Sequence, residues 1–433
     1  MPISRRQFIK RSAAAVTVGV VVPQWLAGTA RGQHTELAGN RRFVIIQLAG
    51  GNDGLNTVVP YTDARYYALR PVLAWKEAEL KTAAGASTII SDRFGLHPAL
   101  SEIKGLYDAN RVAIVTGVGY PNATQSHFLS MDIWHTADLS GLASRGWLGR
   151  FADLALVGQS NLSALSIGSL DTPKTFYAAH FVTPNILNLD LYQFLADGAY
   201  PGDYNNQLNT FNLAATRSFA ADTLMGAINK TAFESVSGAQ VVQQAARSYH
   251  SSVVYPTDNP LAVGLKLAAQ LLTTVPEAAI LYVRLDGFDH HADQVAHRNG
   301  QVDKLAGAGN NHFNLMRWFS QAVKLFYDDL TEHGLADNTV IMQWSEFGRR
   351  PGENASFGTD HGSSAPLFLI GNPVRGGLYG EQPSLAATAL DLAGNPGFTV
   401  DFRAVYATLL DRWLGVNPVE VLGAGYENIG FLP

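Results

Sequence analysis

The chain has 433 residues, no cysteine, 47% hydrophobic residues and a formal net charge of −5. This composition supports a sizeable core and excludes disulfides, thiolate nucleophiles, zinc fingers and iron–sulfur clusters, so any metal must be held by nitrogen or oxygen ligands. The mildly acidic balance provides no basic stripe to neutralise phosphates, which argues against nucleic acid as a partner.

The first 33 residues resemble a twin-arginine (Tat) export signal. Arg5 and Arg6 precede an apolar run over residues 13–22, which Pro23 ends, and small residues follow at 28–30. The run is about half as long as the roughly 20 residues that span a bilayer, so we expect no stable membrane span. We predict a signal peptide over 1–33, the Tat translocase as a partner during export, and a periplasmic or secreted protein. The alternative is an uncleaved signal that tethers the protein.

Buried strands alternate with helices along the rest of the chain. Runs rich in β-branched residues predict strands over 43–48, 112–118, 279–285, 339–344 and 366–370. Apolar residues at helical spacing predict helices over 96–110, 311–332 and 402–414. This alternation predicts an α/β fold, with a mostly parallel central sheet covered by helices on both faces.

One segment breaks this alternation. Residues 203–274 are rich in Ala, Asn and Gln and poor in strand signals. We therefore predict a helical insertion or cap there, within a single domain over 34–433.

Potential metal ligands lie next to the predicted strands. Functional residues of open α/β sheets gather at the carboxyl ends of the strands. The candidates beside the five strands are Asp53 after the first, Thr124, Ser126 and His127 after the second, Asp286, Asp289, His290 and His291 after the third, Glu346 and Arg349 after the fourth, and His361 before the fifth. Oxygen and imidazole ligands from separate segments suit a divalent metal and do not suit a soft one.

Several of these candidates have a purely structural alternative. Asp53 could belong to a turn, Glu346 could open a helix, and Thr124 or Ser126 could be an N-cap. The cluster at 289–291 is a stronger ligand candidate, because surface loops seldom carry two adjacent histidines flanked by aspartates. We expect structural roles for the remaining histidines considered, which are His97, His180, His250, His312 and His333.

The ordered set of motifs resembles the bacterial proteins called domain of unknown function 1501. The motifs are QLAGGNDGLNT at 47–57, GYPN at 119–122 with SHF at 126–128, FDHHA at 288–292, SEFGR at 345–349 and TDHG at 359–362. That family is grouped with the alkaline phosphatase/sulfatase-like superfamily. The resemblance therefore implies an alkaline phosphatase-like three-layer sandwich, with hydrolysis of phosphate or sulfate esters at one or two metals.

The resemblance also implies ligand roles. Asp53 resembles the first-strand metal aspartate of the superfamily, and His361 its last metal histidine. Glu346 stands where the superfamily usually has an Asp-His pair, with Phe347 in the histidine place. Near the third strand, Asp289 with His291 and Asp286 with His290 remain alternative ligand pairs.

Superfamily enzymes place Ser, Thr or a modified Cys at a helix N-terminus as the nucleophile. Without cysteine a formylglycine mechanism is excluded, and the candidates are Ser126, which we favour, and Thr124. In this scheme His127 would orient the ester or act as the acid, and a second cation or Arg349 would neutralise charge on the ester oxygens.

We therefore predict an exported, metal-dependent hydrolase acting on small-molecule or polysaccharide esters of phosphate or sulfate. The divalent metal could be zinc, calcium, magnesium or manganese. The alternative is a non-catalytic exported binding or assembly protein that keeps the fold and a structural metal, which the Glu346–Phe347 replacement favours. A dinucleotide protein is disfavoured because the glycines at 50–54 lack the GxGxxG spacing.

Overall fold

The structure is a computed structural model that describes residues 40–81, 86–169, 171–189, 192, 197, 199–216, 223–298, 301–305 and 311–433. The Tat signal expected over 1–33 lies outside the described residues and stays a prediction. No helix in the described part of the chain is long and apolar enough to cross a membrane.

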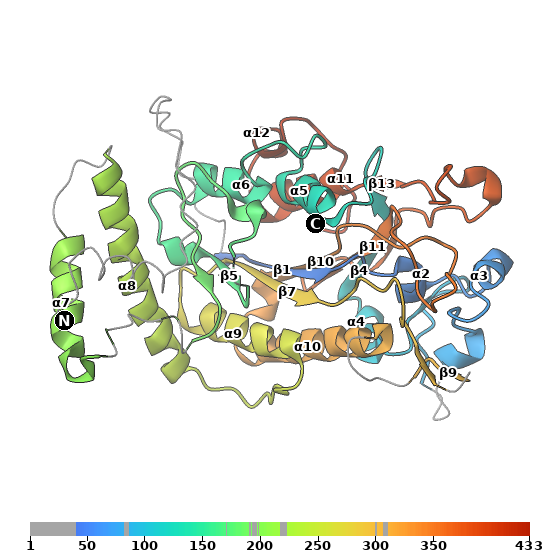
Figure 1. Ribbon diagram of the computed structural model, residues 1–433, viewed down its shortest axis with the longest axis horizontal. Helices are drawn as coiled ribbons and strands as arrows, with labels where there is room; N and C mark the ends of the chain where they lie inside the picture. The colour runs from blue at the N-terminus through green and yellow to red at the C-terminus, as the bar shows by residue number, and fades with distance from the viewer. Residues whose placement is uncertain are drawn as a thin grey trace.

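A nine-stranded mixed sheet forms the centre of the molecule, in the order β12-β4-β11-β10-β1-β7-β5-β6, with β13 also paired to β4 (Figure 1). The strands are β1 (Arg42–Ala49), β4 (Val112–Gly119), β5 (Ala164–Ile167), β6 (Asn185–Ile186), β7 (Ile280–Asp286), β10 (Thr339–Trp344), β11 (Ala365–Ile370), β12 (Gly377–Tyr379) and β13 (Val400–Asp401). Within this sheet β11 pairs antiparallel with both β10 and β4, and the other pairings are parallel. The strands predicted from the sequence are confirmed.

The central strand β1 is apolar except for Arg42 at its start and Gln47, because both of its faces are buried. Phe43 and Ile45 pack into the core on one face of the sheet, whereas Val44, Ile46 and Leu48 pack into the core on the other. Because helices cover both faces, a polar side chain on either face loses its contact with water. Gln47, which is 1% exposed, accepts a hydrogen bond from the Tyr282 hydroxyl at 2.6 Å instead.

Two layers of helices enclose the sheet (Figure 1). One face carries α4 (Ser101–Asp108), α9 (Pro260–Thr274) and α10 (His312–Glu332), and the other carries α5 (His127–Thr136), α6 (Trp147–Ala155), α11 (Phe402–Leu409) and α12 (Pro418–Leu422). The predicted closing helix at 402–414 is α11 followed by a π-helical turn over Leu410–Leu414. The predicted α/β sandwich, with helices on both faces of a mostly parallel sheet, is confirmed.

The shorter elements lie at the edges of this sandwich. They are α2 (Gly54–Thr57), β2 (Val58–Val59), α3 (Ala64–Leu69), β3 (Gly95–Leu96), β8 (Ala296–Arg298) and β9 (Gln301–Asp303). β2 pairs with β3 and β8 with β9, each antiparallel and outside the main sheet.

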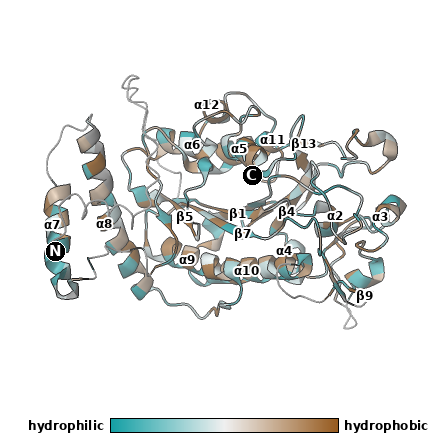
Figure 2. Ribbon diagram, viewed as in Figure 1, coloured by the Kyte–Doolittle hydropathy of each residue, from teal (hydrophilic) through white to brown (hydrophobic). Residues whose placement is uncertain are grey.

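The segment 203–274 holds three helices: α7 (Tyr204–Ala215), α8 (Leu224–Ser248) and α9. α9 packs against α10 and β7, and its Leu261, Leu265 and Leu272 are buried in the core, so it belongs to the layer that covers the sheet. α7 and α8 lie beyond the β5 end of the sheet, and polar and apolar residues alternate along them (Figures 1 and 2). Of the segment expected as a cap, only α7 and α8 lie outside the layer that covers the sheet. That these two helices form a cap stays a prediction.

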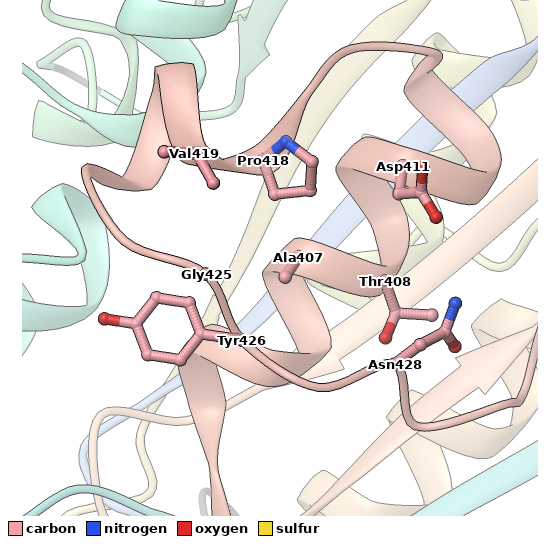
Figure 3. A pocket seen from close by; sticks show the side chains of 8 residues that line it. All are labelled: Ala407, Thr408, Asp411, Pro418, Val419, Gly425, Tyr426 and Asn428. Carbon is pink, nitrogen blue, oxygen red and sulfur yellow. The ribbon is translucent and has the colours of Figure 1, made fainter.

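A pocket of about 230 Å³ lies between α11, α12 and the C-terminal segment (Figure 3). It is lined by Ala407, Thr408, Asp411, Pro418, Val419, Gly425, Tyr426 and Asn428. None of the ligand or nucleophile candidates is among these residues, so the candidate site lies elsewhere.

Candidate metal centre

Three segments far apart in sequence meet beside the carboxyl ends of β1 and β7. His127 comes from the start of α5, Asp289 from the loop after β7 and His361 from the loop before β11. Each offers one ligand atom, and these atoms all lie within 4.8 Å of one another. Among the described residues this is the one such group of three or more histidine, aspartate or glutamate side chains. Two imidazoles and a carboxylate are a suitable donor set for zinc or a similar divalent cation.

The carboxylate of Asp289 lies between the two imidazoles. Its Oδ1 is 3.1 Å from His361 Nε2, and its Oδ2 is 3.4 Å from His127 Nε2. The Asp289 side chain is about half exposed, at 49%, so solvent or a substrate can reach the cluster from that side.

The remaining ring nitrogens determine which tautomers the two histidines adopt. His127 Nδ1 is 2.9 Å from Glu346 Oε1, and His361 Nδ1 is 2.7 Å from the carbonyl oxygen of Gln125. The Glu346 carboxylate and the Gln125 carbonyl only accept, so each Nδ1 carries a proton. Each Nε2 faces the Asp289 carboxylate, which also only accepts, so Nε2 holds either a second proton directed at Asp289 or, when a metal is bound, a lone pair directed at the cation. The Nε2 of His127 is buried and has no hydrogen-bond partner within the described part of the chain. Metal-binding histidines typically show this arrangement, with the far nitrogen donating to an acceptor.

His291 brings a third imidazole to the cluster. Its Nε2 is 2.8 Å from His361 Nε2 and 3.2 Å from Asp289 Oδ1, while its Nδ1 is 3.2 Å from Asp360 Oδ1. With both Nδ1 atoms donating, two Nε2 lone pairs face each other at 2.8 Å. A shared proton or a bound cation removes this repulsion, so the arrangement fits a metal ion.

Glu346, expected as a ligand, contacts the cluster through His127. It is 1% exposed, and its Oε1 accepts from the backbone N–H of Gly50 at 2.8 Å as well as from His127. The hydrogen bond to Glu346 is the main cause that raises the pKa of His127. The geometry favours a positioning role for Glu346, one step removed from the cation.

Asp53, also expected as a ligand, is committed to a buried ion pair. Its Oδ2 is 2.6 Å from Arg70 Nη1 and 2.5 Å from Gln294 Nε2, and its Oδ1 accepts from the backbone N–H of Asn56 at 3.4 Å. Burial acts to raise the pKa of Asp53, but Arg70, His312 and Gln294 together outweigh burial and lower it. Asp53 is therefore not part of the cluster of His127, Asp289 and His361. Sequence inspection missed Arg70 and Gln294, because neither stands near Asp53 in the chain.

The structure separates the two alternative pairs near β7. Asp289 and His291 belong to the cluster. Asp286 is exposed and pairs with Arg284 at 2.5 Å. His290 is buried, with its ring 5.9 Å from that of His312. The geometry therefore favours Asp289 with His291.

Arg349 holds Asp289 in place. Its side chain is fully buried, and its Nη2 is 2.8 Å from Asp289 Oδ1. Its other donors bind backbone carbonyls of the three loops around the site, namely Gly50, Gly51, Phe288 and Thr359. Burial acts to raise the pKa of Asp289, but Arg349 and His361 outweigh it and lower the pKa to about 2. A guanidinium so committed is suited to positioning a ligand and poorly suited to the expected neutralisation of an ester.

The two hydroxyl candidates lie at the start of α5. Ser126 is the N-cap, its Oγ accepting from the Leu129 N–H at 3.5 Å, and Thr124 Oγ1 accepts from the Ser126 N–H at 3.2 Å. The structural alternative, an N-cap, is therefore realised for Ser126. Because Ser126 adjoins His127 and follows Gln125, whose carbonyl binds His361, it still lies beside the cluster.

Gly50 lets the loop after β1 approach the cluster closely. Its φ is +120°, and a Cβ there would lie 2.5 Å from the backbone nitrogen of Asp289. A side chain at this position would displace the loop that carries Asp289.

Comparison with known proteins gives one family match. A family model described as "Protein of unknown function (DUF1501)" matches residues 200–422, just over half of the chain. Among curated proteins no match is found.

Several solved structures show a weak likeness. A protein in the alkaline phosphatase superfamily from Vibrio parahaemolyticus is 12% identical, with 88% of this chain and 72% of that chain covered and a TM-score of 0.37. The C-terminal periplasmic domain of EcEptC from Escherichia coli, in complex with Zn, is 10% identical over 80% and 76% of the two chains, with a TM-score of 0.39. The lipoteichoic acid synthase LtaP from Listeria monocytogenes is 10% identical over 98% and 79%, with a TM-score of 0.37.

Proposed function

The chain belongs to the DUF1501 family of proteins of unknown function, and from this premise we propose that it is a metal-dependent hydrolase of phosphate or sulfate esters. The observation that carries the proposal is the convergence of His127, Asp289 and His361, with their Nε2 lone pairs and carboxylate directed at one point. Histidine and carboxylate ligands with a solvent-facing side are typical of catalytic metal sites, which keep a position open for substrate.

The donor set suits one divalent cation. His127, Asp289 and His361 would hold it, with His291 as a fourth ligand, and zinc fits this nitrogen-rich set better than calcium or magnesium, which prefer oxygen. When bound, such a cation supplies Lewis acidity and lowers the pKa of a hydroxyl at the site.

The protein's own groups prepare the site for an ester. Glu346 holds the Nδ1 proton of His127, and Arg349 keeps Asp289 ionised. The positive end of the α5 dipole would favour an anionic ester beside Ser126. We keep Ser126 ahead of Thr124 as the nucleophile. Its Oγ would lose its proton to solvent and bond to phosphorus or sulfur, while the bond to the leaving oxygen breaks and that oxygen takes up a proton. Water would then cleave the Ser126 ester, which releases phosphate or sulfate and restores the hydroxyl.

Export completes the proposal. The twin arginines at Arg5 and Arg6 support folded export through the Tat translocase to the periplasm or the medium. The substrate would then be a small-molecule or polysaccharide ester outside the cytoplasm.

Metal analysis and an ester screen test this function together. We expect the purified protein to hold one divalent metal per chain and to hydrolyse at least one ester in a panel of phosphate and sulfate esters. Asp289→Ala and His361→Ala should lose both metal and activity. Protein without stoichiometric metal, or metal-loaded protein inactive on the whole panel, would contradict the proposal. Full activity in Ser126→Ala would remove only the nucleophile assignment.

One observation favours a second candidate, an exported binding protein with a structural metal. The ring of Phe347 lies 4.8 Å from that of His127 and 4.7 Å from that of His361, so an apolar side chain flanks the cluster where a second metal would need ligands. A protein whose melting temperature rises strongly with metal but which cleaves no ester would support this candidate.

A further inference from the structure

The end of β7 is uncovered on the side that faces α5. β7 lies between β1 and β5 in the middle of the sheet. On this side Tyr282 is buried, but the next two side chains, Arg284 and Asp286, are 37% and 68% exposed. A central strand in a sheet covered on both faces is normally apolar throughout. The exposed charges therefore mark an opening in the helix layer above the end of β7.

One face of α5 and a short 3₁₀ turn, η4 (Lys174–Phe176), border this opening. Phe128, Asp132 and His135 share a face of α5, because they are four and three residues apart. Asp132 accepts from Lys174 Nζ at 2.8 Å, and His135 Nε2 lies 3.2 Å from the hydroxyl of Tyr282. These contacts place that face of α5 over β7, with Lys174 at its side.

Two cations stand in this opening, Arg284 and Lys174. Burial is the main cause that lowers the pKa of His135 to about 3, and the charges of Arg284 and Lys174 add to it, so both cations lie within electrostatic reach of the same buried ring. Arg284 is 2.5 Å from a carboxylate oxygen of Asp286, and Lys174 binds Asp132. A guanidinium offers five N–H donors and an ammonium three, so each cation can bind a further acceptor.

The opening adjoins the metal centre along both of its walls. On α5, Phe128 directly follows His127, and its side chain is 83% exposed. After β7, Asp286 precedes the ligand Asp289 by three residues. Asp132, which holds Lys174, lies five residues along α5 from His127, about 7.5 Å at 1.5 Å per residue, so a substrate a few bonds longer than the ester group would reach Lys174.

We propose that this opening is the substrate groove of the metal centre, and that Arg284 and Lys174 bind a second anionic group of the substrate, distinct from the ester that is cleaved. The inference rests on the proposed function and adds a substrate class, namely esters that carry a further carboxylate, sulfate or phosphate. Arginine binds such groups through two parallel hydrogen bonds and lysine through a compact charge. Asp132 and Asp286 compete with the substrate's anion for the two cations.

Binding of non-hydrolysable phosphonates tests the groove independently of turnover. Calorimetry on the metal-loaded full chain would compare phenylphosphonate with its 3-carboxy and 4-carboxy derivatives. We expect at least one carboxylated compound to bind about tenfold tighter, which corresponds to one charge-assisted hydrogen bond. Arg284→Gln and Lys174→Gln should each reduce this ratio toward one, and Asp132→Asn should increase it. Lys266→Gln, on the exposed side of α9, is the matched control and should leave the ratio at its original value.

The outcomes separate this inference from the proposed function. Equal affinity of the wild-type protein for all the phosphonates, or a carboxylate preference that survives both substitutions, would overturn the groove assignment. A carboxylate preference that Arg284→Gln abolishes, in a protein that cleaves no ester, would support the groove and contradict the hydrolase. The inference also requires that Asp289→Ala abolishes binding of phenylphosphonate, whereas Arg284→Gln and Lys174→Gln do not. This result would show that the metal centre and the groove are separate subsites.

Discussion

Replacing Glu346 by glutamine should weaken metal binding about tenfold while leaving the fold intact. Both hydrogen bonds to this side chain, from Gly50 N–H and from His127 Nδ1, end on Oε1, and a glutamine oxygen in the same place can accept both. The new amide nitrogen would replace Oε2, which lies 3.3 Å from Ser345 Oγ, so it can donate there. The substitution therefore removes a negative charge behind His127 and little else.

The loss follows from the change in that hydrogen bond. A bond to a charged acceptor contributes about 1.5–3 kcal/mol and a neutral one about 0.5–1.5 kcal/mol. The difference, about 1.4 kcal/mol, is tenfold in affinity and matches the lower end of what removing a metal ligand's partner costs. Competition with a chelator for zinc would measure it, with Glu420→Gln on the exposed side of α12 as the control.

Two results would refute this reasoning. An unchanged affinity would mean that Glu346 does not act on the ligand. A loss as complete as that in Asp289→Ala would mean that Glu346 binds the metal directly, as first expected from the sequence.

Further predictions concern stability and export. Arg70→Met leaves Asp53 charged and unpaired in the core, so we expect a loss of about 3–5 kcal/mol in the free energy of unfolding, measured by urea denaturation; a loss below 1 kcal/mol would contradict the buried pair. His135 and His312 have pKa values of about 3 in the folded protein, chiefly because of burial. A histidine in the unfolded chain has a pKa of about 6.5. Between pH 6.5 and 3 the unfolded state therefore binds more protons than the folded state. The free energy of unfolding should fall on acidification through this window by about 1.4 kcal/mol per pH unit for each histidine. Urea midpoints that stay constant from pH 6.5 to 4.5 would contradict the low pKa values of both histidines. Replacing Arg5 and Arg6 together by lysine should leave the precursor in the cytoplasm, and normal export of this variant in a fractionation assay would exclude the Tat signal.

Long apolar runs could be identified from the sequence, and short strands could not. β1, β4, β10 and β11 each bury six or more residues and β7 buries five, on both faces of the sheet, which produces a mostly apolar run. Strands such as β6 and β13 have two residues each and leave no periodic pattern. They pair only because a neighbouring strand presents its edge, and that depends on the assembled sheet.

The candidate site was predictable in its chemistry and less so in its membership. Asp289, His291 and His361 were expected as ligands from their local motifs, and the structure brings their donor atoms together. His127 was expected to act on the ester, but the structure places its Nε2 3.4 Å from Asp289 Oδ2, within the ligand cluster. Asp53 was expected as a ligand and instead pairs with Arg70.

The sequence by itself determined the types of donor, the absence of thiolate ligands and the placement of the candidates beside the ends of the strands. These properties depend on residue identity and on local periodicity, both of which a chain displays along its length. Only the tertiary structure decided which donor atoms remain open to a cation. Arg70 neutralises Asp53, Arg349 orients Asp289, and the carbonyl of Gln125 selects the tautomer of His361. Each partner is distant in sequence from the group it controls, so its effect exists only once the loops have come together.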